Sequence, residues 1–212
     1  MHPDKAQHTI HRLEAFSDIV IGFCLAELGL SLVLPKGASD VFSVWESTTV
    51  FISAFIFVAV LWWLHHRTFS AFFILNPSMI VMNFGVLGGL ILTLYFLESI
   101  VRVAELGQNP SLFFALFVFA FALVYTLVGL MLLTGLVGRR AELPAEDVRW
   151  AIGQLTSIAM AVLFGLAAGT YAVRSESLGA IVVVAVALAA AIVVVRRRFV
   201  PRWIERSAPN RG

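Results

Sequence analysis

Two acidic residues, Asp18 and Glu27, interrupt an apolar stretch near the start of the chain. If that stretch is a helix in a membrane, each charged side chain costs about 3 kcal/mol unless it meets water or a partner. Acids in such a position are therefore candidates for ion passage or for joining helices. Glu46 and Glu98 lie at the ends of apolar segments, where a carboxylate reaches water easily, and we interpret them as ordinary interfacial residues.

Helical geometry separates the two acids. At about 100° per residue, Phe23, Leu30 and Leu34 share one face of a helix. Glu27 lies within about 40° of Phe23, whereas Asp18 points about 140° away from it. Glu27 therefore interrupts an apolar stripe. One acid in such a stripe is typical of a helix that lines a narrow pore, and also of two packed helices joined by a protonated, hydrogen-bonded Glu. Asp18 is expected to face neighbouring helices of the same chain.

Candidate partners for Asp18 occur in two later apolar segments. Trp62 and His66 are four residues apart and therefore share a helix face, and His65 lies on the adjoining one. Asn83 follows in the next apolar segment. An indole, two imidazoles and an amide could satisfy the Asp18 carboxylate in a buried network.

The other polar residues form no recognisable catalytic or metal-binding pattern. Four histidines are conceivable as metal ligands, namely His8, His11, His65 and His66. The last two diverge by about 100° around a helix, and no thiolate or paired acid supports them. Cys24 is the only cysteine, which excludes an intrachain disulfide. No nucleophile and base stand at a known spacing, so we predict no enzyme, no metal site and no cofactor.

Composition indicates the elements that must position these residues. Of the 212 residues, 60% are hydrophobic and 13% are charged, with a mean hydropathy of +0.93, which excludes a soluble globular domain. Because one membrane-spanning helix takes about 20 apolar residues, six such helices would account for almost all the hydrophobic residues of the chain. We predict an all-α, polytopic membrane protein formed by one six-helix domain over residues 1–212. The predicted spans are 12–34, 47–64, 77–97, 112–137, 148–173 and 178–195.

The basic residues predict the orientation of these spans. With the N-terminus inside, twelve Lys and Arg residues lie on the cytoplasmic side and only three on the other, namely Lys36, Arg102 and Arg174. We therefore predict that both termini are cytoplasmic. The run Arg196-Arg197-Arg198 is interpreted as a basic flank that contacts anionic lipid, and no nucleic-acid partner is expected.

Two motifs and one further residue resemble a known family. Residues 12–18 read Arg12-Leu13-Glu14-Ala15-Phe16-Ser17-Asp18 and fit the pattern Arg-x-x-x-Phe-Ser-Asp. Residues 62–66 read Trp62-Trp63-Leu64-His65-His66 and fit Trp-x-x-His-His, and Asn83 follows in the third predicted span. Over residues 12–83 the chain resembles the lysosomal and prokaryotic potassium channel family called transmembrane protein 175.

The resemblance implies a six-helix subunit in a bacterial inner membrane that assembles as a homotetramer around a pore for potassium or other monovalent cations. The pore is expected to be lined by the first helix, with an apolar constriction at Phe23 and Leu30. The pore-lining residues implied on this helix are Phe23, Ala26, Glu27, Leu30 and Leu34. The residues implied to support it from behind are Arg12, Phe16, Ser17, Asp18, Trp62, His65, His66 and Asn83.

Several pore positions depart from the family pattern and leave the permeant ion open. Ile19 replaces a small residue and Phe23 an aliphatic one, Ala26 stands where a threonine is common, and Glu27 stands where an apolar residue is usual. Such a pore could prefer potassium, pass several monovalent cations or protons, or be closed. We predict a monovalent cation channel of the potassium type, and the alternative is a proton-coupled or proton-conducting transporter, motivated by Asp18, Glu27 and the histidines.

Overall fold

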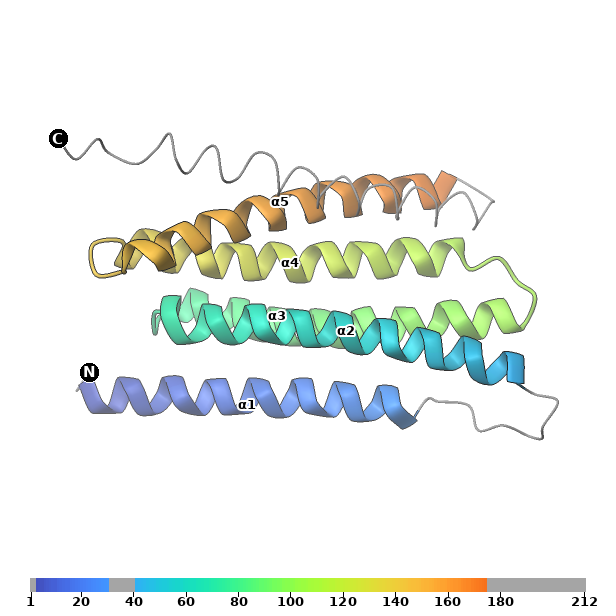
Figure 1. Ribbon diagram of the computed structural model, residues 1–212, viewed down its shortest axis with the longest axis horizontal. Helices are drawn as coiled ribbons and strands as arrows, with labels where there is room; N and C mark the ends of the chain where they lie inside the picture. Colours follow the sequence, from blue (N-terminus) through green and yellow to red (C-terminus); the bar gives the residue numbers. More distant parts are fainter. Residues whose placement is uncertain (1–2, 31–40, 175–212) are drawn as a thin grey trace. The chain divides into compact units, whose positions relative to one another are not determined.

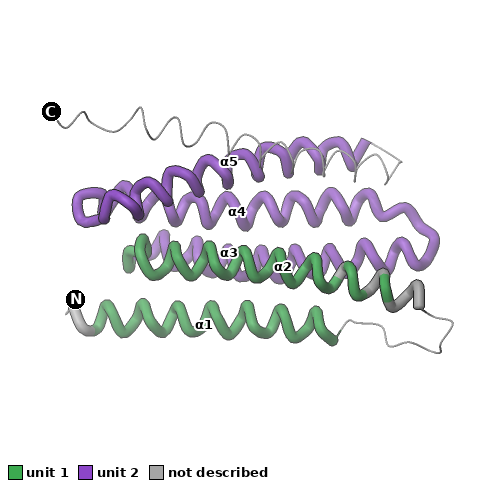
Figure 2. The backbone as a smooth tube through the Cα atoms, viewed as in Figure 1, with its two compact units in different colours: residues 1–75 green, residues 76–212 purple. Residues whose placement is uncertain are grey.

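The computed structural model describes residues 3–30 and 41–174, and these residues form helices joined by short connections (Figure 1). The helices are α1 (Pro3–Leu30), α2 (Val41–Phe72), α3 (Pro77–Glu105), α4 (Ser111–Arg139) and α5 (Ala145–Arg174). The chain divides into two compact units, residues 1–75 and residues 76–212 (Figure 2). The first unit holds α1 and α2, and the second holds α3, α4 and α5.

The prediction of six membrane-spanning helices is wrong. Within the described residues, four segments are long and apolar enough to cross a membrane, namely Phe51–Phe72, Pro77–Glu105, Ser111–Arg139 and Ala145–Arg174. The first predicted span, 12–34, lies mostly in α1, which is not among the four. Six charged residues are spread along α1 and lower its hydropathy, namely Asp4, Lys5, Arg12, Glu14, Asp18 and Glu27. The sixth predicted span, 178–195, lies outside the described residues.

The second predicted span, 47–64, is also too short. It stops one residue before His65 and two before His66, whereas α2 continues to Phe72. Thr68 is buried and donates its hydroxyl to the Leu64 carbonyl at 2.8 Å, which satisfies a polar side chain inside the helix. The two histidines therefore lie in the interior of α2, where neighbouring side chains can surround them.

Local capping defines both ends of α3. Asn76 precedes the helix and accepts a hydrogen bond from the Met79 backbone N–H at 2.8 Å, while Pro77 occupies the first turn. At the other end Gly107 adopts a φ of +70°. Its N–H donates to the Ala104 carbonyl at 2.9 Å, and the N–H of Gln108 donates to the Val103 carbonyl at 3.1 Å. A glycine suits this left-handed position because it has no Cβ.

In the second unit, α4 packs against both α3 and α5. Glycines bring these helices close: a Cβ added at Gly89 of α3 would lie 2.7 Å from Val124 Cγ2 of α4. A Cβ added at Gly169 of α5 would lie 2.8 Å from the Phe119 ring of α4. Small residues at helix contacts are what membrane helices need, because lipid provides no hydrophobic drive for association and close packing must replace it.

Candidate functional site

The first unit joins α1 to α2 through one face of α1. Ser17, Ile21 and Cys24 are buried and recur at the spacing of one helix face. The Ser17 hydroxyl donates to the Leu13 carbonyl of its own helix at 2.9 Å, so a polar side chain is accommodated in the contact. Of the residues implied to support the pore helix, Ser17 and Asp18 are thus on or beside the face that meets α2, and Arg12 is exposed.

Four polar or aromatic side chains meet beside this face, and we call Glu14, Asp18, Trp62 and His66 the polar cluster. The Trp62 indole donates to Asp18 Oδ1 at 2.8 Å. One turn away, His66 Nδ1 lies 3.2 Å from Glu14 Oε1. The Trp62 and His66 rings stack with centroids 5.5 Å apart and an angle of 17°. Because Glu14 pairs with the later residue of α2 and Asp18 with the earlier one, the two helices are antiparallel.

Glu14 is the member of the polar cluster that sequence reasoning missed. It fell on a variable position of the Arg-x-x-x-Phe-Ser-Asp pattern and was given no role. The available signal was spacing: Glu14 precedes Asp18 by four residues, just as Trp62 precedes His66 by four. Two such pairs on adjacent antiparallel helices can face each other in register.

The two adjacent histidines have different surroundings. His65 is 1% exposed, and its ring lies 5.1 Å from that of Phe69, which stacks on Phe73 at 4.0 Å. His66 instead stacks on Trp62 in the polar cluster. Asn83 is fully buried in α3, within the second unit. The proposed contact of Asn83 with the Asp18 network therefore stays a prediction.

The opposite face of α1 carries several exposed side chains. Phe23 is 72% exposed and Leu30 is 81% exposed, and Ala26 between them is exposed as well. Ile19 extends the same stripe toward the N-terminus at a four-residue spacing. Phe16, expected to support the pore helix from behind, lies three residues before Ile19 and is 45% exposed. Glu27 is exposed at the edge of this stripe. We call Ile19, Phe23, Ala26 and Leu30 the open stripe; Leu34 lies outside the described residues.

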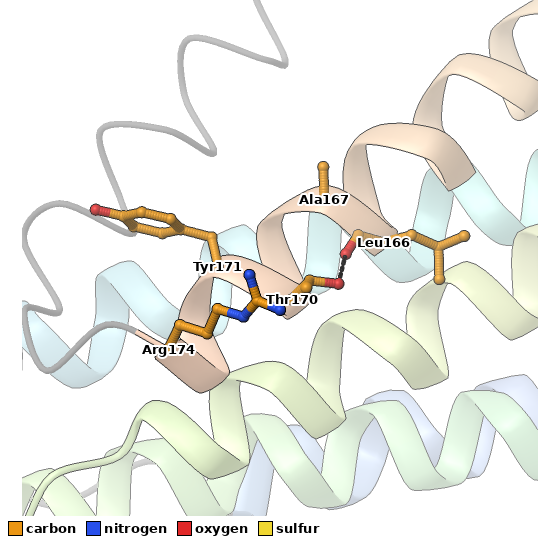
Figure 3. Close-up of a pocket in the computed structure, with 5 residues that line it drawn as sticks. All are labelled: Leu166, Ala167, Thr170, Tyr171 and Arg174. Carbon is orange, nitrogen blue, oxygen red and sulfur yellow. Dashed lines mark hydrogen bonds between the residues drawn. The ribbon is translucent and has the colours of Figure 1, made fainter.

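Other features of the described residues offer no competing site. Across residues 3–30 and 41–174, no three His, Cys, Asp or Glu side chains are placed to hold a metal ion. A hollow near the end of α5 is lined by Leu166, Ala167, Thr170, Tyr171 and Arg174 (Figure 3). Thr170 donates to the Leu166 carbonyl at 2.7 Å, within the same helix. Since all the described lining residues belong to α5, this hollow is a helix face.

Comparison with known proteins supports the resemblance found in the motifs. The model of the family described as endosomal/lysosomal potassium channel TMEM175 matches residues 12–94. This range contains the polar cluster, the open stripe and Asn83. A potassium channel of Chryseobacterium sp. (strain P1-3) is 30% identical over 124 residues, which cover 55% of this chain and 62% of that protein. The chain thus matches less than two thirds of the relative's length, and no solved structure matches it significantly.

Proposed function

From the match of residues 12–94 to a potassium channel family, we propose that this membrane protein is a monovalent cation channel of the potassium type whose pore is lined by α1. The observation that carries the proposal is the division of α1 into two faces. One face, with Ser17, Ile21 and Cys24, is buried. The other is the open stripe, which α2 does not cover.

The composition of α1 fits a helix that does not face lipid all round. Its charged residues keep it outside the set of helices apolar enough to cross a membrane by themselves. Asp18 accepts the Trp62 indole at an exposed position, not in the buried network expected from the sequence, so one polar group on that side has a partner within the chain. A helix with one side bound to protein and the other facing an aqueous path avoids the cost of burying charge in hydrocarbon.

A single open stripe cannot enclose a path for ions. Several copies of α1 must converge to do so, and we propose a homo-oligomer, with the tetramer implied by the family resemblance. Phe23 and Leu30 would then form apolar rings that raise a desolvation barrier for ions. Glu27 lies between them along the chain and would supply a ring of carboxylates that attracts cations.

The basic residues at the helix connections support an orientation in the membrane. Arg139 and Arg140 end α4, and Arg149 lies in the first turns of α5. Arg67 lies toward the end of α2. Because cytoplasmic flanks attract Lys and Arg, we propose that the α4–α5 connection, the end of α2 and the N-terminus of α1 lie on the cytoplasmic side of a bacterial membrane.

The function is tested with the purified full-length chain reconstituted in planar bilayers. We expect unitary currents and, under opposed potassium and sodium gradients, a reversal potential displaced toward the potassium equilibrium potential. Bilayers that receive protein-free detergent extract serve as the control. Ion flux without unitary currents would favour the transporter alternative, and the absence of any cation flux from correctly folded protein would overturn the proposal.

A further inference from the structure

The charged side chains of α1 are sorted by sign between its two faces. At about 100° per residue, Lys5 lies in line with Phe23 around the helix axis, and Arg12 lies within about 20° of it. Glu14 and Asp18 point about 180° and 140° away from Phe23. Lys5 and Arg12 are exposed. Between Lys5 and Asp18, the positive charges therefore lie on the side of the open stripe and the negative charges lie on the side of α2.

The two acids and the arginine differ in their surroundings. Trp62 donates to Asp18 Oδ1 at 2.8 Å, and His66 Nδ1 lies 3.2 Å from Glu14 Oε1. The Arg12 guanidinium makes no ion pair or hydrogen bond with any described side chain. Because a guanidinium cannot be deprotonated in a protein, Arg12 contributes a fixed positive charge to its face of the helix.

Arg12 and Glu27 lie on opposite sides of Phe23 along the helix. Arg12 precedes Phe23 by eleven residues, which is about 17 Å at the rise of an α-helix. Glu27 follows Phe23 by four residues, or about 6 Å, and lies within about 40° of the same face. The face that holds the open stripe is thus positive toward the N-terminus and carries its negative charge beyond Phe23.

We propose that Arg12 makes the conduction path electrically asymmetric, so that cations enter less readily from the Arg12 end than from the Glu27 end. The inference rests on the channel proposed above, in which copies of α1 surround the path. Copies of Arg12 then form a positive ring at one mouth, which lowers the local concentration of cations there. Copies of Glu27 raise that concentration on the other side of Phe23. With the N-terminus in the cytoplasm, the outward cation current is the smaller one.

A basic residue near the start of a membrane helix can instead contact anionic lipid headgroups. That placement requires Arg12 to point away from the path and toward the bilayer. The alignment of Arg12 with Phe23 argues against it, since a residue that points at lipid cannot share the face that lines the path.

The asymmetry has a defined dependence on ionic strength. The screening length is about 10 Å in 0.1 M salt and about 3 Å in 1 M salt. At the lower concentration the charge of Arg12 acts across the mouth of a narrow path, and at the higher concentration it is largely screened. A difference in current that arose only from the shape of the path would not be removed by salt.

The test is the unitary current of the purified full-length chain in planar bilayers with equal potassium chloride on both sides. In about 0.1 M salt, we expect the currents at equal and opposite voltages to differ by about twofold to threefold, and in about 1 M salt we expect their ratio to approach one. Arg12→Gln should raise the smaller current at the low concentration and leave the larger one nearly unchanged. Because the two currents are compared within one channel, the result does not depend on the direction in which the channel inserts.

Two matched variants isolate the charge of Arg12. Arg12→Lys keeps a positive charge at the same place and should keep the asymmetry. Arg140→Gln removes an exposed arginine at the end of α4, in the second unit, and should leave both currents unchanged. The salt series uses the wild type alone, so it tests the inference even if a variant does not fold.

Equal currents in both directions at low salt, or an asymmetry that survives Arg12→Gln, would overturn the inference, and the second result would place Arg12 among the lipid headgroups. An asymmetry that disappears equally in Arg12→Lys would show that the charge is not its cause. Unitary currents in each of these outcomes would leave the channel proposal intact. The absence of unitary currents from the folded wild type would overturn the channel proposal and this inference with it.

Discussion

The two compact units join their helices by different means. In the first unit, α1 is tied to α2 by the polar cluster and keeps an open stripe on its other side. In the second unit, α3, α4 and α5 meet through glycines and apolar side chains such as Gly89 and Val124. The second unit is therefore closely packed at its glycines, whereas α1 keeps exposed apolar and acidic side chains on one face.

The largest effect on folding is expected where the second unit is most tightly packed. In Gly89→Ala the new methyl group would lie 2.7 Å from Val124 Cγ2, and relieving this overlap should cost about 1–3 kcal/mol of unfolding free energy. The matched control is Gly88→Ala at the neighbouring position, where an added Cβ would have no atom of another described residue of the fold within 4 Å. Thermal unfolding in detergent measures both variants. Equal stability of the two would show that α3 and α4 can separate slightly, and the contrast between the units would fail.

A smaller loss is expected when the polar cluster is cut. Asp18→Ala removes the acceptor of the Trp62 indole, and because Trp62 is partly exposed, water can replace the bond in part. We expect a loss of about 1 kcal/mol. A double-mutant cycle with Trp62→Phe isolates the pair, since the second substitution should cost little once the first is made. Additive effects of the two substitutions would mean that this bond does not couple α1 to α2.

The positions of the three helices in the second unit could be predicted from the sequence. Those of the two helices in the first unit could be predicted only in part. The predicted spans 77–97, 112–137 and 148–173 fall inside α3, α4 and α5, because long apolar runs end there at Pro, Gly and charged residues. The span count failed at α1, where charged residues lower the hydropathy and the helix relies on α2 to satisfy them. The hydropathy of a segment does not show whether another helix supplies hydrogen-bond partners for its charged residues.

The residues of the candidate site could likewise be predicted only where one segment of the sequence was enough to indicate their role. The residue types of the Asp18–Trp62 pair were found because an acid in an apolar helix needs a donor. Glu14 was not found, since its role depends on the register between α1 and α2 and not on its own segment. His65 and His66 were correctly expected to diverge around the helix, but their positions in the interior of α2 followed from burial of Thr68 and Phe69, which local polarity did not indicate.

Substitutions in the open stripe should change the unfolding free energy very little and the unitary conductance strongly. Phe23 is 72% exposed, so Phe23→Ala should change the unfolding free energy of the monomeric unit by no more than about 0.5 kcal/mol. If Phe23 narrows the pore, the same variant should raise the unitary conductance and weaken discrimination among monovalent cations. Ile52→Ala, at an exposed apolar position of α2, is the control. Unchanged currents with normal expression would move the constriction away from Phe23.

The smallest effect on the fold is expected at Glu27, and it tests whether the open stripe faces an aqueous pore or a helix seam. Glu27 is exposed, with no ion pair or hydrogen bond in the part of the chain that the structure describes, so Glu27→Gln should leave thermal stability unchanged. In a pore, the carboxylates attract cations, so Glu27→Gln should lower cation entry and with it the unitary current. In a seam, the Glu would be hydrogen-bonded to a neighbouring copy. Glu27→Gln would then weaken the oligomer while the unitary current stayed the same, and α1 would form a subunit contact and would not line the path.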